Sequence, residues 1–404
     1  MSLTAAEQRV CGIISGRHAA MVEQLRQLVN IPTGPGSAGG LDETRGLLTE
    51  RLAKLGAAVE LVPGDPKPTW LDPEDRGSVP PTAVCRRPRT TPHLPKEHRA
   101  GVLLCGHLDT VHHASSSFRE LSISPDGRTA TGPGCVDMKG GLLVGATALE
   151  ALEEAGVAAG WGFIMNSDEE TGSYHSDTAL QAEAKRGYRE GLVLEPAMAD
   201  GGLVTERPGS GQFMIETRGR ASHVGRDFGA GVSAVNALAA CILRVSQLVD
   251  TSRGRIVNIG PLQGGVAANV VPDLARAWGN VRFPTYEAGE ELGRALEAME
   301  TAPSELPGVK VYRSFNRPAK PRTPQVDALA IHARWAAEAL GQQLPFGKTG
   351  GVCDGNNLQA AGLPTIDTLG VRGGGLHTPQ EWIELASLVE RAQLLAVLIM
   401  RLSQ

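Results

Sequence analysis

The sequence predicts an α/β protein with a mixed, mostly parallel sheet flanked by helices and with a smaller α+β domain inserted in it. In the first half of the chain, short apolar runs alternate with helical segments, which is the rhythm of a parallel sheet. From about residue 210 this rhythm changes, and after Arg317 it resumes. The length of 404 residues, at roughly 150 residues per domain, fits two or three domains.

The first part of the chain supplies most of the expected sheet. Helices are expected where apolar residues recur at helical spacing, over residues 18–30, 41–55 and 138–154. Strands are expected at the short apolar runs 58–62, 82–86, 101–106, 161–166 and 191–194. The stretch 63–81 is dense in proline, which lacks the N–H that a strand needs, so it is predicted to be an insertion or loop.

The middle of the chain predicts a complete β-α-β-β-α-β unit of the ferredoxin-like type. Its strands are expected at 212–219, 255–262, 274–283 and 309–315, and its helices at 231–249 and 289–299. A helix over 327–340, a strand at 365–370 and a helix over 386–402 follow. We therefore divide the chain into the first part of a catalytic domain (1–209), an inserted domain (210–316) and the second part of the catalytic domain (317–404).

Composition excludes several classes of partner. The chain has seven Phe, five Trp and four Tyr and a net charge of −5, so it lacks the ring faces and basic blocks of a nucleic-acid binder. No window of about 18 apolar residues predicts a membrane span, and no signal peptide is expected. The six cysteines form no C-x-x-C pair and are expected to be reduced, in a cytoplasmic protein.

The strand VLLCG leads directly into His107-Leu108-Asp109. Residues two apart in extended backbone face the same way, so His107 and Asp109 can lie together at the carboxyl end of a strand. A histidine beside a carboxylate is a common metal ligand with its orienting group. Taken alone, this fragment is explained better by a core histidine and a turn aspartate.

Further carboxylates and a second histidine stand at other strand or loop ends. Asp137 lies in a Gly-rich loop that lacks the GxxxxGK[ST] order of a phosphate loop, Glu169 and Glu170 follow a strand, and Glu195 ends the next one. His377 lies in a late Gly-rich loop. Two imidazoles and three carboxylates, with Asp137 able to bridge, suit two divalent metal ions, and one of the adjacent glutamates can serve as a general base.

The motifs GHLDTV, GPGCVDMKGG, SDEETGS, LEP and LHTPQEW resemble those of the two-zinc metallopeptidase family that contains carboxypeptidase G, acetylornithine deacetylase, succinyl-diaminopimelate desuccinylase and aminoacylase. The resemblance covers nearly the whole chain. It implies a zinc-exopeptidase-like fold whose inserted domain acts as a lid and dimerisation domain. It also implies two Zn²⁺ per subunit, with Co²⁺ or Mn²⁺ as alternatives.

The resemblance also implies a role for each site residue. The metal ligands would be His107, Asp137, Glu170, Glu195 and His377. Asp137 would bridge the ions, Glu169 would be the general base for a bridging water, and Asp109 would orient His107. His223 would contact the substrate carbonyl, often from the partner subunit of a homodimer. Asn269, Arg282 and Arg317 would contact the substrate, although ordinary strand and surface arginines explain the last two equally well.

The sequence thus predicts a hydrolase that cleaves an amide bond beside a free carboxylate, like carboxypeptidase G, with release of a C-terminal amino acid such as glutamate. Glu195 favours carboxypeptidases and deacylases over aminopeptidases, which typically carry Asp there. The alternatives are an N-acyl amino acid deacylase of the acetylornithine deacetylase or desuccinylase type and an inactive small-molecule-binding relative. The segment Gly351-Val352-Cys353-Asp354 departs from the family pattern and leaves the substrate open. The expected partner is a small carboxylate-bearing peptide or N-acyl amino acid, with neither nucleic acid nor membrane.

Overall fold

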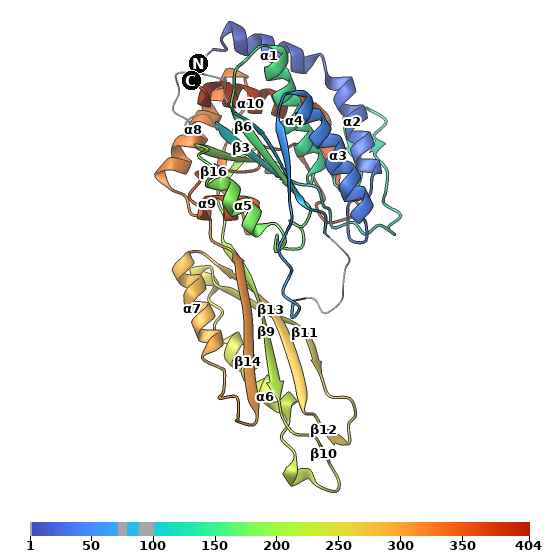
Figure 1. The fold of residues 1–404 in the computed structure, drawn as a ribbon, viewed down its shortest axis with the longest axis vertical. Helices are drawn as coiled ribbons and strands as arrows, with labels where there is room; N and C mark the ends of the chain where they lie inside the picture. Colours follow the sequence, from blue (N-terminus) through green and yellow to red (C-terminus); the bar gives the residue numbers. More distant parts are fainter. Residues whose placement is uncertain (1, 72–78, 89–100) are drawn as a thin grey trace.

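A six-stranded sheet with the strand order β1-β2-β6-β3-β7-β16 forms the centre of the larger lobe (Figure 1). The computed structural model describes residues 2–71, 79–88 and 101–404. The strands of this sheet are β1 (Ala58–Val62), β2 (Thr82–Arg87), β3 (Val102–His107), β6 (Trp161–Asn166), β7 (Glu190–Val193) and β16 (Thr365–Ile366). Those from β6 to β16 are parallel, and β1 and β2 extend the sheet in antiparallel pairing. The predicted mixed, mostly parallel sheet is confirmed.

Strand β3 is buried on both faces, which explains its continuous apolar run. Val102 and Leu104 face one hydrophobic cluster, and Leu103 and Cys105 face another, because side chains alternate across a strand. The first cluster is covered by α1 (Ala5–Ser15), α2 (His18–Asn30), α3 (Ala38–Lys54), α4 (Lys139–Glu154), α8 (Pro324–Ala339) and α10 (Ala386–Leu402). The second is covered by α5 (Asp177–Ala184) and α9 (Asp354–Ala360).

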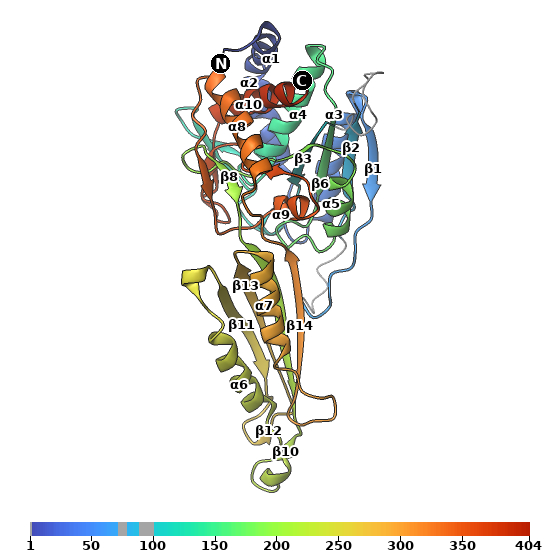
Figure 2. The same ribbon diagram turned by 90° about the vertical axis from the view of Figure 1, so that its left-hand side faces the viewer.

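The smaller lobe contains the predicted β-α-β-β-α-β unit. Its strands are β9 (Gly209–Arg218), β11 (Ile256–Gly264), β13 (Leu274–Phe283) and β14 (Gly308–Arg317), in the antiparallel order β11-β13-β9-β14. Helices α6 (Ala234–Ser246) and α7 (Tyr286–Glu297) cover one face of this sheet (Figure 2). The residue boundaries that we predict for the domains stay predictions.

Short elements join these two sheets or lie beside them. A separate four-stranded sheet has the order β17-β18-β5-β4. The short strands are β4 (Ser122–Ile123), β5 (Thr129–Thr131), β8 (Leu203–Glu206), β10 (Ser222–His223), β12 (Val270–Val271), β15 (Phe346–Lys348), β17 (Gly373–Gly374) and β18 (Trp382–Glu384). No helix among the described residues is long and apolar enough to cross a membrane.

The chain passes between the lobes twice, and the two passages pair with each other. Arg207 and Lys320 exchange backbone hydrogen bonds of 2.9 and 3.0 Å. The side-chain amide of Asn356 donates to the carbonyl oxygens of Pro208 and Pro318, at 2.9 and 2.7 Å. One buried side chain at the start of α9 therefore ties both passages to the larger lobe.

The described part of the Pro-rich stretch is a loop, as expected, and it also joins the lobes. At one end Asp65 donates its backbone N–H to the carbonyl oxygen of His175 in the larger lobe at 3.0 Å. At the other end the Trp278 indole donates to the carbonyl oxygen of Trp70 at 2.5 Å, and the Trp70 and Tyr312 rings lie 6.2 Å apart. Residues 72–78 of this stretch lie outside the described residues.

Candidate metal centre

The five predicted metal ligands meet at the carboxyl edge of the parallel strands. His107 ends β3, while Glu170 and Glu195 lie in the segments that follow β6 and β7. Parallel strands open at the same edge of a sheet, which brings these three side chains together. Asp137 reaches them from the loop before α4, and His377 from the loop between β17 and β18.

The ligands form two adjoining groups that share Asp137. In the first, His107 Nε2 lies 3.2 Å from Asp137 Oδ1 and 3.9 Å from Glu195 Oε1. In the second, His377 Nε2 lies 3.5 Å from Asp137 Oδ2 and 3.2 Å from Glu170 Oε2. Within each group the candidate ligand atoms lie within 4.8 Å of one another. Asp137 thus turns one carboxylate oxygen toward each group, as a bridging ligand would.

Burial and mutual contact shift the pKa values of these groups. Burial, followed by the charge of Asp137, raises the pKa of Glu195 to about 8. Hydrogen bonds to Asp137 and Glu170 raise the pKa of His377 to about 10. Burial raises the pKa of Asp137, but its hydrogen bonds with His107 and His377 outweigh this and lower it. Several buried carboxylates lie close together here. A pair of divalent cations would compensate their negative charge.

Asp109 connects the histidine ligand to the adjacent glutamates. Its carboxylate accepts the backbone N–H groups of Glu169 and Glu170, at 3.2 and 2.9 Å. The same carboxylate lies 3.4 Å from His107 Nδ1, and the Asp109 carbonyl oxygen lies 3.0 Å from that nitrogen. A proton on Nδ1 satisfies both oxygens and leaves Nε2 free for a metal. This position supports the predicted orienting role of Asp109.

Glu381 holds the Asp137 loop and was not singled out from the sequence. Its buried carboxylate accepts the backbone N–H groups of Gly134, Val136 and Asp137, at 2.9, 3.0 and 3.1 Å, and contacts His112 Nε2 at 2.8 Å. The only sequence signal was its place within the LHTPQEW motif, close to His377. One carboxylate therefore fixes the backbone that presents the shared ligand.

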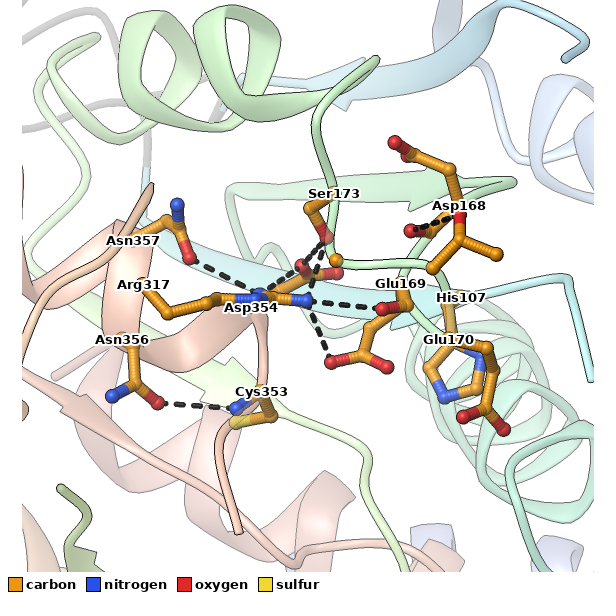
Figure 3. Close-up of polar contacts among 12 residues, drawn as sticks. His107, Asp168, Glu169, Glu170, Ser173, Arg317, Cys353, Asp354, Asn356 and Asn357 are labelled. Carbon is orange, nitrogen blue, oxygen red and sulfur yellow. Dashed lines mark hydrogen bonds and ion pairs between the residues drawn. The ribbon is translucent and has the colours of Figure 1, made fainter. Parts of the chain in front are cut away.

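Glu169 lies beside the metal ligands and is paired with an arginine (Figure 3). Arg317 Nη2 donates to Glu169 Oε1 at 2.8 Å, and Nη1 donates to Asp354 Oδ1 at 2.7 Å. The guanidinium also contacts Ser173 and Asn357, at 2.7 and 3.1 Å. Burial raises the pKa of Glu169, and the charge of Arg317 opposes that rise.

Arg317 is held by protein groups, and its predicted contact with substrate stays a prediction. The Arg317 side chain is 3% exposed. Its Nη1 and Nη2 donate to protein groups, whereas its buried Nε has no hydrogen-bond partner among the described residues. Arg282, the other predicted substrate arginine, is half-buried on β13 and donates to Asn280 Oδ1 at 2.6 Å and to Ser210.

His223 and Asn269 lie away from the metal ligands of their own chain. His223 is part of β10, and Val224 donates its N–H to the carbonyl oxygen of Asn269 at 3.1 Å. Both residues are exposed. Strands β10 and β12 lie at the end of the smaller lobe that is farthest from the larger lobe, in both views (Figures 1 and 2). A single chain thus brings together the predicted ligands, Glu169 and Asp109, but not these two residues.

A parallel sheet whose edge gathers two sets of imidazole and carboxylate ligands, with a further glutamate beside them, defines a metal-dependent hydrolase. The family model for peptidase family M20/M25/M40 matches residues 103–401, and the chain belongs to this family. The family resemblance expected from the motifs is thereby confirmed.

Individual relatives agree with this family. The chain is 29% identical over 402 residues to carboxypeptidase G2 of Pseudomonas sp. strain RS-16, a match that covers 95% of this chain and 89% of the relative. A tripeptidase of Staphylococcus aureus has the same fold, with a TM-score of 0.74, 22% identity and coverage of 96% of this chain and 98% of that one. A dinuclear metal binding peptidase of Bacillus subtilis matches with a TM-score of 0.62, 17% identity and coverage of 96% and 99%.

Proposed function

We propose that this protein is a two-metal carboxypeptidase that cleaves an amide bond next to a free carboxylate and releases a C-terminal amino acid such as glutamate. The observation that carries the proposal is the shared position of Asp137 between two ligand groups, with Glu169 beside them. Similarity to carboxypeptidase G2 along 95% of the chain supports the carboxypeptidase direction of cleavage.

The donor set fits two divalent ions. His107, Asp137 and Glu195 would hold one, and Asp137, Glu170 and His377 the other. Mixed imidazole and carboxylate ligands suit Zn²⁺, with Co²⁺ or Mn²⁺ as alternatives. The dinuclear peptidase of Bacillus subtilis, which has the same fold, supports a two-ion site.

When bound, such ions supply polarisation of the substrate carbonyl and a lower pKa for the attacking water. The chain's own contribution is proton transfer. The Glu169 carboxylate takes a proton from the attacking water and then gives it to the leaving amine. Arg317 holds that carboxylate in place from one side, at 2.8 Å. Asp109 fixes the backbone from the other, through the N–H groups of Glu169 and Glu170.

Substrate contacts are proposed for residues on the smaller lobe. Arg282 is a half-buried cation, which suits a substrate carboxylate. We propose that Arg317 acts mainly by holding Glu169 and only secondarily through substrate. Asn269 and His223 would act from the partner subunit, since they lie at the far tip of their own chain.

A homodimer formed through the smaller lobe would supply that partner. Strand β11 is an edge strand of its sheet, and its residues are mostly exposed. Leu243, Ile256, Leu262 and Val266 are large apolar residues with exposed fractions of 67, 49, 59 and 96%. Such exposure on α6, β11 and the next loop favours contact with a second copy. We place the protein in the cytoplasm, because the six cysteines are all free and buried.

The test combines metal analysis with a panel of N-peptidyl and N-acyl amino acids in which the carboxyl-side residue is Glu, Asp, Arg, Ala or diaminopimelate. We expect two ions per subunit and the highest kcat/KM for peptidyl substrates that end in Glu. A preference for N-acyl substrates would identify a deacylase instead. Release of an amino-terminal residue would reject the proposal, and no hydrolysis by metal-loaded protein would favour an inactive small-molecule-binding relative.

A further inference from the structure

A separate pocket of about 100 Å³ opens beside the C-terminal end of α2. Its floor is formed by the buried residues Thr33, Thr110, Pro133 and Lys139, and its rim includes the exposed side chains of His113 and Arg119. None of the predicted metal ligands lines it. At 10–15 Å³ per water-sized site, the pocket has room for several such atoms but not for a peptide.

The floor of the pocket carries two side chains, Lys139 and Thr33, whose polar atoms have few or no hydrogen-bond partners among the described residues. Lys139 is 1% exposed, and the hydrogen bond of its ammonium among the described residues goes to the carbonyl oxygen of Ile31 at 2.7 Å. The hydroxyl of Thr33, also 1% exposed, has no hydrogen-bond partner in the described part of the chain. A buried ammonium and a buried hydroxyl each lose free energy unless a partner satisfies them.

Basic side chains line the pocket. Arg119 and Lys139 are among its described lining residues, none of which is a carboxylate, although one lining residue, His112, contacts the Glu381 carboxylate at 2.8 Å. Arg119 uses two of its nitrogens to bind the carbonyl oxygens of Ser116 and Ala114, which fixes the guanidinium at the rim. The fixed Arg119 cation at the rim attracts an anion, and the buried Lys139 side chain, whose pKa burial lowers to about 7, can donate a hydrogen bond to it.

We propose that this pocket binds a small oxyanion, with the Lys139 ammonium and the Thr33 hydroxyl as floor donors and Arg119 as the rim cation. Inorganic phosphate or sulfate fits this chemistry, and so does the carboxylate of a free amino acid. The site would be present whatever amide the metal centre cleaves.

The pocket contacts the backbone that presents a metal ligand. Thr110 follows Asp109 directly, and its Cγ2 lies only 2.5 Å from where a Cβ on Gly134 would be, so the Gly134 loop packs closely against it. His112, another lining residue, contacts Glu381 at 2.8 Å, and Glu381 holds the N–H of Asp137. An oxyanion in the pocket would therefore be linked to the position of Asp137.

The direct test uses selenate, because selenium scatters anomalously and locates the ion. Crystals of the metal-loaded full chain are soaked in selenate, and calorimetry measures its affinity in solution. We expect an anomalous peak among Thr33, Arg119 and Lys139. A peak confined to the metal ligands, or no peak, would overturn the proposal. A pocket peak without measurable binding in solution would mean an adventitious ion only, and would overturn it as well.

Variants assign the donors. Thr33→Val and Arg119→Gln each remove one donor, and we expect each to weaken selenate binding about tenfold, because hydrogen bonds to charged groups are of that strength. Arg253→Gln is the matched control, since Arg253 is 76% exposed on the smaller lobe. Lys139→Met should abolish selenate binding. If the Lys139→Met protein does not fold, Thr33→Val and Arg119→Gln test the proposal. Unchanged affinity in both of those variants would contradict the proposal.

Two further titrations distinguish the source of the oxyanion. Inorganic phosphate and L-glutamate are titrated separately into the wild type and into Thr33→Val. Tighter phosphate binding that Thr33→Val weakens would identify a free inorganic ion. Tighter glutamate binding that Thr33→Val weakens would identify an amino-acid carboxylate. Binding of both probes that Thr33→Val leaves unchanged would count against the pocket.

Discussion

Arg317 donates to Glu169 Oε1 at 2.8 Å, through a guanidinium that is almost completely buried between the lobes. Its other terminal nitrogen donates to Asp354 at 2.7 Å. Asp354 is itself fixed by Ser173 and Asn166, at 2.6 and 2.7 Å. The proposed general base is thus joined through one cation to a carboxylate anchored at the start of α9, and the resting position of Glu169 depends on that cation.

Arg317→Met should therefore impair both stability and turnover. Removal of one partner from a buried ion pair leaves Asp354 and Glu169 uncompensated, which typically costs about 3–5 kcal/mol of unfolding free energy. Arg317→Lys keeps the charge but cannot donate in two directions from one plane, so we expect an intermediate loss. Urea denaturation and kcat measure the two effects. If Arg317→Met keeps the wild-type stability and kcat, the ion pair between Arg317 and Glu169 contributes to neither.

Glu169→Gln should remove turnover but leave the metal site intact. The amide is nearly isosteric with the carboxylate but cannot accept a proton, and a positioned general base contributes about 10²–10⁴-fold to the rate. We expect kcat to fall by at least that factor while metal content per subunit stays at the wild-type value. Glu23→Gln is a suitable control, because Glu23 is 75% exposed. A Glu169→Gln variant with normal kcat would require a different base.

Glu381→Ala should weaken metal binding without removing a ligand. The backbone N–H groups of Gly134, Val136 and Asp137 would lose their acceptor, and Asp137 would be held less firmly. Loss of a group that orients a ligand typically costs about 10–100-fold in metal affinity. Competition with a chelator measures this. Glu384→Gln is the control, because Glu384 pairs with Arg372 instead, and equal affinity in both variants would contradict the prediction.

The five predicted metal ligands, which stay a proposal, were accessible from the sequence as a cluster because each one follows an apolar strand or lies in a recognisable loop. His107 ends β3 and Glu195 follows β7, the neighbouring parallel strand, and that topology places them together. The contacts of Glu381 and Arg317 were not accessible, because each joins segments far apart in the chain whose approach only packing decides. The same holds for Trp70, which meets Tyr312 across the lobes. Sequence indicates which groups carry chemistry, whereas their supporting groups depend on long-range contacts.

Metal uptake should release protons at neutral pH. The pKa of Glu195 is raised to about 8 and that of His377 to about 10, so both groups hold a proton at pH 7 in the metal-free protein. Both must lose it to ligate a metal. Burial lowers the pKa of His107, but its hydrogen bonds with Asp109 and Asp137 raise it well above the ordinary value, so this ligand must lose a proton as well. We therefore expect release of about three protons. Metal affinity should fall as the pH is lowered from 8 to 6, because protons then compete more strongly with the metal ions for the ligand side chains. Calorimetry in buffers of different ionisation enthalpy measures the proton release.

His377→Ala separates the two contributions. It should release about one proton fewer than the wild type, and equal release would remove His377 from the proton balance. The pKa of His377 is raised above its ordinary value of 6.5, so its stabilisation of the metal-free protein is complete below that pH and is lost as pH rises toward 10. The difference in thermal stability between the chelated wild type and His377→Ala should therefore shrink from pH 6 to pH 10.

Asn356→Ala should loosen the junction between the lobes. The amide donates to the carbonyl oxygens of Pro208 and Pro318, one on each passage of the chain, and loss of two buried hydrogen bonds predicts a destabilisation of about 2–4 kcal/mol. Gln359→Ala is the matched control, because the half-buried Gln359 donates one solvent-exposed hydrogen bond, to Pro321, and its loss should cost less stability than Asn356→Ala. Solution scattering should show a wider spread of lobe arrangements in Asn356→Ala. If both variants match the wild type in stability and scattering, the Asn356 amide is not needed to keep the lobes in place. The backbone pairing of Arg207 with Lys320 would then join the two passages by itself.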